Sequence, residues 1–241
     1  MRILALMLLL VAGLQIPAQA DATLYEFWLA SDEKAPKNKA VKKGKLGFAQ
    51  ILKNQSGKMS LVFSGTSTPL EGSHTILLLQ EYEQAGKRAL IGTMSSGSFV
   101  FDLYHGYLQW FASAAPRYFA LVPKNKASWQ GIAPPVLPVG APSPGAQSGK
   151  SKTSVANHVA QQLHYPKSAR DGGFSGMVVV KAWIAADGKT TLAQLERSAS
   201  FALDVEALRL ALLLPAQAPA TDEAGAPLGS WLSFPVTFIL N

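Results

Sequence analysis

Hydrophobic and polar positions follow their clearest pattern in the last third of the chain, residues 165–241. Residues 175–184 are rich in β-branched side chains and predict a strand, and the alternation over 190–197 predicts a second one. The Asp187-Gly188 pair between them predicts a tight hairpin, because glycine adopts positive φ without strain. These two strands are therefore expected to pair antiparallel.

A helix is expected next, over residues 201–214. Ser200 is a candidate N-cap, and Asp204 and Glu206 lie near the positive end of the helix dipole. Pro215 ends the helix, because proline has no N–H for the next helical hydrogen bond.

Residues 231–240 place alternate large apolar side chains on one face and predict a last strand. The helix lets the chain cross the sheet, so this strand returns on the other side of the first one and becomes an edge. Pro235 agrees with an edge, where a missing N–H is tolerated. An open edge accepts another chain's strand; a covering loop or a second copy of the domain is the alternative.

The fold class expected for this third is α+β, with the order β-β-α-β, a three-stranded antiparallel sheet and one packed helix. Residues 21–129 predict a different, mostly β domain, a small antiparallel barrel or sandwich. Turn residues separate about eight short strand candidates: 22–29, 46–52, 59–63, 74–82, 88–94, 99–103, 107–111 and 118–122. The aromatic side chains at 99–119 fit its core, although a ligand groove is the alternative.

Two other segments carry recognisable composition. Residues 1–20 predict a signal peptide, with Arg2, an apolar stretch over 3–16 and a small-x-small cleavage site at 18–20; a short uncleaved anchor is the alternative. The stretch is shorter than the about 20 residues of a membrane-spanning helix. Residues 130–156 are rich in Pro, Gly and Ser and predict a flexible linker. A short amphipathic helix over 155–163 is expected to lead into the domain 157–241.

The last third resembles the C-terminal domain of the TonB family of energy-transducer proteins. The residues that carry the resemblance, in order, are Tyr165, Pro166, Ala169, Arg170, Gly173, Gly176, Val178, Val180, Ile184, Asp187, Gly188, Ser198, Leu203, Asp204, Ala207, Leu208, Leu214, Pro215, Ala216, Gly225, Pro227, Pro235, Val236 and Phe238.

The resemblance implies docking of the short extended "box" peptide of outer-membrane transporters by strand addition to the last strand. It also implies that polar residues before the Tyr-Pro pair help to hold that peptide, a place that Gln162 takes here. The residues expected to bind a partner are Gln162, Tyr165, Pro166, Trp231, Leu232, Ser233, Phe234, Pro235, Val236, Thr237 and Phe238.

Two positions depart from the family pattern. The helix end lacks the usual aromatic residue and reads Ala-Leu-Leu-Leu over 211–214, which alters packing. Residues 3–16 contain no His or Ser, although energised members use such positions to meet inner-membrane proton-channel proteins. Those proteins are expected partners only if the segment is retained as an anchor, so energy coupling is in question.

The sequence contains no recognisable catalytic or metal-binding motif, so we expect that the protein is not an enzyme. Cysteine is absent, and the four histidines, at 74, 105, 158 and 164, have no metal-ligand spacing. No nucleotide-binding, hydrolase or metalloprotease motif is present, so no catalytic residue, cofactor or metal is expected. The net charge of +7 fits acidic surfaces in general, and we expect no nucleic-acid partner.

The expected function is that of a periplasmic protein that docks an outer-membrane TonB-dependent transporter or another envelope protein. An adaptor without energy coupling is the second hypothesis. In the third, the β domain binds a ligand and the C-terminal domain makes a homodimer. Inner-membrane anchoring is the alternative location.

Overall fold

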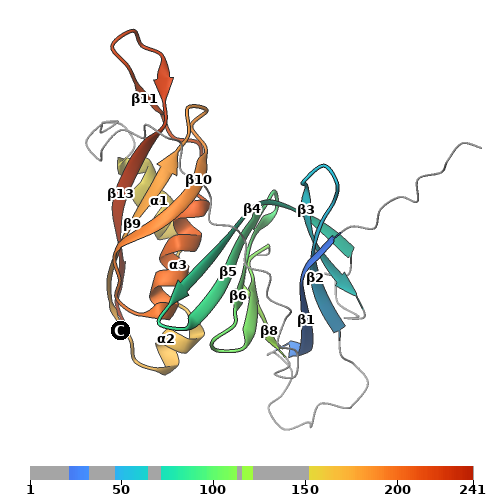
Figure 1. The fold of residues 1–241 in the computed structure, drawn as a ribbon. Coiled ribbons are helices and arrows are strands. Elements are labelled where there is room, and N and C mark those ends of the chain that lie inside the picture. The colour runs from blue at the N-terminus through green and yellow to red at the C-terminus, as the bar shows by residue number, and fades with distance from the viewer. Residues whose placement is uncertain (1–21, 33–46, 65–71, 113–115, 122–151, 241) are drawn as a thin grey trace, which may run out of the picture.

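The computed structural model describes residues 22–32, 47–64, 72–112, 116–121 and 152–240. Strands of the first half form a barrel, and strands and helices of the second half form an α+β unit beside it (Figure 1). The elements are β1 (Ala22–Asp32), β2 (Gly47–Lys53), β3 (Met59–Ser64), β4 (Gly72–Gln84), β5 (Lys87–Met94), β6 (Gly97–Asp102), β7 (Tyr107–Trp110), β8 (Arg117–Leu121), α1 (Lys152–Gln162), α2 (Lys167–Asp171), β9 (Gly176–Ile184), β10 (Thr190–Arg197), α3 (Phe201–Leu212), β11 (Ala220–Thr221), β12 (Pro227–Leu228) and β13 (Ser230–Phe238).

The eight strands expected in the first half are all present and pair antiparallel in sequence order. Irregular pairing of β1 with β8 closes them into a barrel, so the barrel form is found and the sandwich is not. Phe63, Phe99 and Phe101 are almost fully buried among the apolar side chains that fill the interior. This packing accounts for part of the aromatic cluster and argues against a ligand inside the barrel.

The C-terminal sheet has the order β10-β9-β13, with both pairs antiparallel. Gly188 has φ +82 and closes the turn between β9 and β10, as the Asp-Gly pair predicted. Among the residues that the structure describes, β13 pairs with β9 alone and lies at one edge of the sheet, also as predicted. The α+β fold expected for this third is therefore confirmed.

The helix expected near 201–214 is α3, which covers one face of the sheet (Figure 1). Ser200 takes the N-cap position without a side-chain capping bond. The Asp204 carboxylate instead accepts the backbone N–H of Ala199 at 3.0 Å, just before the helix. The amphipathic helix expected over 155–163 is α1.

All twelve residues of α3 are buried, because the barrel covers the face that the sheet leaves open. Leu203 and Leu208 share one apolar core with Ala89, Ile91 and Val100 of the barrel strands β5 and β6. Figure 1 shows α3 between the two sets of strands. The barrel, expected as a separate domain, is thus packed directly against the C-terminal one.

Several sequence-based predictions fall outside the described residues. They concern the signal peptide at 1–20 and residues 130–151 of the linker. The last residues of the predicted linker belong to α1. In the part of the chain that the structure describes, no helix has both the length and the apolar character to cross a bilayer.

Candidate docking groove

The strand β13 offers a regular backbone edge. It pairs with β9 over nine consecutive residues, from Ser230 to Phe238, without a bulge. A regular ladder through Pro235 is best accommodated with the proline backbone directed away from β9, because proline has no N–H to give. Backbone direction alternates along a strand, so Ser233 and Thr237 also direct their N–H and C=O groups to the open edge.

The side chains of β13 alternate between buried and exposed positions with the same two-residue period. Phe234, Val236 and Phe238 are buried and face the core, whereas Ser233, Pro235 and Thr237 are exposed. The core-facing residues hold the strand in place. A partner therefore meets β13 mainly through the backbone and the exposed side chains.

A groove of about 580 Å³ runs between β13 and the helix α1. Apolar side chains line most of it, which suits an extended peptide that buries every second side chain. The lining residues are Val155, Ala156, Val159, Ala160 and Leu163 from α1, and Leu232, Ser233, Phe234, Pro235 and Thr237 from β13.

The structure thus brings five of the eleven predicted partner-binding residues into one groove and places the others elsewhere. Trp231 packs edge-on against Trp183 of β9 and lies under the Lys181 ammonium, 4.9 Å from its ring centroid. Val236 and Phe238 support the strand from the core side.

The residues before the sheet have structural contacts. Tyr165 donates its hydroxyl hydrogen bond to the carbonyl of Phe174 and packs edge-on against Phe238. Pro166 is buried at the N-cap of α2. Gln162 has an exposed side chain at the end of α1, and its backbone carbonyl accepts a hydrogen bond from Arg209.

Sequence reasoning missed the helical wall of the groove. Val155, Val159 and Leu163 lie four residues apart, so their common stripe was visible in the sequence. Nothing local indicated that part of this stripe would stay uncovered beside β13. That outcome depends on how α1 packs against α3, which only the tertiary structure shows.

The barrel blocks the other edge of the sheet at Ala193, in the middle of β10. The Gln80 amide of β4 donates to the Ala193 carbonyl at 2.8 Å and accepts the Ala193 N–H at 3.0 Å. This pair of bonds imitates a neighbouring strand on the open side of β10. Within the described residues, β13 therefore remains as the edge available for strand addition.

Two histidines lie where α1 and the segment after it meet the rest of the molecule, and His158 bonds α1 to α3. His158 donates from Nε2 to the Leu210 carbonyl of α3 at 3.2 Å, and burial lowers its pKa. Burial also lowers the pKa of His164, and the Arg209 charge acts in the same direction against the opposing effect of Glu206. Both side chains are therefore held neutral at neutral pH.

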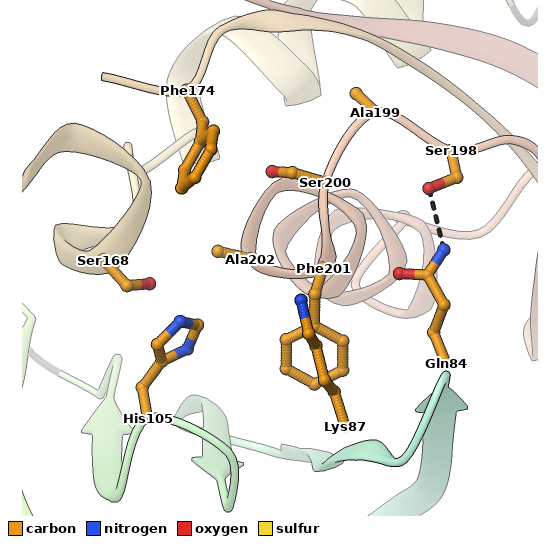
Figure 2. Close-up of a pocket in the computed structure, with 10 residues that line it drawn as sticks. All are labelled: Gln84, Lys87, His105, Ser168, Phe174, Ser198, Ala199, Ser200, Phe201 and Ala202. Atoms are coloured by element: carbon orange, nitrogen blue, oxygen red, sulfur yellow. Dashed lines mark hydrogen bonds between the residues drawn. The ribbon is translucent and has the colours of Figure 1, made fainter. Parts of the chain in front are cut away.

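A second pocket, of about 310 Å³, lies where the barrel meets the start of α3 (Figure 2). Lys87 and His105 of the barrel face Ser168 and Ser200 across it. Its lining is more polar than that of the groove, and it lies away from the open edge of β13. We therefore take the groove as the candidate functional site.

Comparison with known families gives one match. Residues 161–240 match the family model described as "Gram-negative bacterial TonB protein C-terminal". The matched region runs from the last turn of α1 through β13, so the barrel and most of the helical wall lie outside it. Searches of curated proteins and of solved structures gave no match.

The family is a transport energy-transducer domain of the Gram-negative envelope and is not enzymatic. The resemblance seen in the sequence is therefore confirmed: residues 161–240 match the TonB C-terminal family.

Proposed function

We propose that the protein docks an extended peptide of an outer-membrane transporter, or of another envelope protein, by β-strand addition to β13. The observation that carries the proposal is the open backbone edge of β13 beside an apolar groove. The family match supports an envelope role for this domain. We place the protein in the periplasm and its function in TonB-dependent transport.

The geometry favours a peptide that runs along Ser233, Pro235 and Thr237. Backbone hydrogen bonds at these positions supply affinity, at about 1 kcal/mol net for each bond. Alternate peptide side chains enter the groove against Val159 and Leu163, which selects apolar residues there. Pro235 offers a carbonyl but no N–H, so the ladder has one donor fewer at its centre.

The test compares Thr237→Pro with Thr237→Ala. Both remove the same side chain, and only proline removes the N–H that we assign to the open edge. Synthetic peptides copied from the periplasm-facing N-terminal segments of outer-membrane transporters serve as probes in titration calorimetry. We expect Thr237→Pro to weaken binding about tenfold or more, and Thr237→Ala to weaken it little.

A second set of probes carries N-methyl groups on alternate peptide bonds, which block strand pairing and leave the side chains unchanged. Loss of binding in one of the two alternating sets is the expected result. Equal affinity of Thr237→Pro and Thr237→Ala, with both N-methylated sets still bound, would refute strand addition.

An adaptor without energy coupling is the alternative form of this function. It uses the same groove, and inner-membrane proton-channel proteins would be partners only of an anchored form. Cell fractionation separates the two forms. Recovery in the periplasmic fraction without detergent indicates the adaptor, and recovery with the inner membrane indicates an energised transducer.

A further inference from the structure

A buried ion pair connects the barrel to the helical wall of the groove. Arg209 of α3 is 1% exposed and binds the Glu206 carboxylate through Nε at 2.7 Å and Nη2 at 2.6 Å. Its Nη1 donates to the hydroxyl of Ser98 in β6 at 3.2 Å. The guanidinium also lies over the ring of Phe111, 4.1 Å from the centroid. Two barrel residues therefore enclose this charge.

The same pair holds the C-terminal end of α1. Arg209 donates from Nη2 to the carbonyl of Gln162, the last residue of α1, at 2.6 Å. Glu206 accepts the backbone N–H of His164 at 2.8 Å. The last carbonyls of a helix have no partner within the helix, so such contacts fix where it ends. Here they fix the wall that faces β13.

Burial makes this arrangement sensitive to its barrel contacts. A buried charge is stable only when its hydrogen-bonding groups are satisfied and water is excluded. The planar guanidinium serves three directions at once, toward Glu206, toward α1 and toward the barrel. Without Ser98 and Phe111, Arg209 would keep only Glu206 and the end of α1 as partners, and its barrel side would be open to water.

We propose that the barrel sets the geometry of the docking groove through Arg209, which acts as a positioning residue between Ser98 and Phe111 on one side and the end of α1 on the other. Peptide binding in the groove and the packing of the barrel are then thermodynamically coupled, and the coupling is reciprocal. The coupling rests on the proposed function, whereas the positioning of α1 can be measured without any peptide.

The absence of cysteine makes the groove easy to label. Ala160 on α1 and Thr237 on β13 are exposed residues on opposite walls, so nitroxide labels on a double-cysteine variant report the groove width. Hydrogen exchange at the His164 amide reports the bond to Glu206 directly. Both measurements use the full chain without a partner.

Ser98→Ala and Phe111→Leu are the test variants, because each removes one barrel contact and leaves the ion pair intact. Ser60→Ala in β3 is the matched control, since α3 packs on β4, β5 and β6. We expect Ser98→Ala to speed exchange at the His164 amide about tenfold or more and to broaden the label distance distribution. Ser60→Ala should change neither.

Unchanged exchange and unchanged label distances in both barrel variants would overturn the positioning claim. If α1 loosens and transporter peptides bind neither the wild type nor the variants, positioning stands and the proposed docking function fails. If peptides bind, their affinity should fall in Ser98→Ala, and the wild-type complex should protect the Phe111 amide, which donates to the Ser98 carbonyl at 2.9 Å. Affinity equal to that of Ser60→Ala would overturn the coupling.

Discussion

Replacing Gln80 with alanine removes the side chain that closes the β10 edge. Gln80 is 8% exposed, and its amide makes two bonds to the backbone of Ala193. Its loss leaves the N–H and the C=O of Ala193 without partners at an edge that is partly shielded from water. Each unsatisfied buried group costs about 1–3 kcal/mol, and water entering the vacated space offsets part of this. We expect a loss of about 2–4 kcal/mol in the free energy of unfolding.

Gln84→Ala is the matched control in the same strand. Gln84 makes a single exposed bond, from Nε2 to the Ser198 hydroxyl at 3.0 Å, so its removal should cost less than about 1 kcal/mol. Urea unfolding followed by circular dichroism measures both variants. Because α3 shares its core with β5 and β6, each should unfold in one cooperative transition. Equal losses in the two variants would refute the closing role of Gln80.

Gln80→Glu separates the hydrogen bonds from the packing. The glutamate keeps an acceptor for the Ala193 N–H but directs a second carboxylate oxygen at the Ala193 carbonyl, where the wild type has a donor. Protonation turns that oxygen into a donor. The variant should therefore approach wild-type stability as the pH falls, and a difference in unfolding free energy that does not change with pH would contradict this geometry.

Three further predictions concern pH, the shared core and a close contact. Burial lowers the pKa of His158 and His164, so the unfolded chain binds protons more readily than the folded chain does. The free energy of unfolding should therefore fall as the pH falls from about 6.5. The double variant His158→Gln/His164→Gln should show a weaker pH dependence in urea unfolding. Leu208→Ala should cost about 2–5 kcal/mol and lower the thermal midpoint of barrel and sheet together, and separate transitions would contradict the shared core. Gly92→Ala should cost about 1–3 kcal/mol in the same assay, because its Cβ would lie 2.0 Å from the buried ring of Phe99; wild-type stability would refute the contact.

Much of the fold was readable because its signals are local. The Asp187-Gly188 turn, the alternation of β13 and the stop at Pro215 each depend on neighbours in the sequence, and each element was found where the pattern predicted it. The number of barrel strands followed from turn spacing in the same way. Barrel closure did not follow, because the pairing of β1 with β8 joins segments far apart in the chain.

The open edge of β13 was also predicted, from the order of the elements and Pro235. The groove was only half predicted, since its second wall depends on the position of α1. That position is set by Arg209 and by contacts from Ser98 and Phe111, more than 90 residues earlier in the chain. The hydrophobic pattern within a segment cannot predict contacts between residues so far apart in the sequence.

The sequence nevertheless contained one signal that the barrel packs against the C-terminal domain. Residues 89–91 and 99–101 are continuous apolar runs, which is typical of strands covered on both faces rather than of a barrel wall open to water. In the structure, Leu90 points into the barrel while Ala89 and Ile91 meet α3. A second covering layer could therefore have been expected over these strands.

The charged residues of α3 also indicate that this helix is covered on every side. Asp204 and Glu206 were interpreted as partners of the helix dipole, and Asp204 does bind the N–H of Ala199 at the helix start. However, Asp204 also accepts the Tyr82 hydroxyl of β4 at 3.1 Å, and Glu206 is committed to Arg209. A helix that is apolar on every side yet contains three charges has no face to offer to water. Such charges must find partners inside the protein, and here the barrel supplies two of them, Tyr82 for Asp204 and Ser98 for Arg209. The barrel is therefore part of what makes this C-terminal domain stable, and a C-terminal fragment alone would expose those charges and an apolar face together.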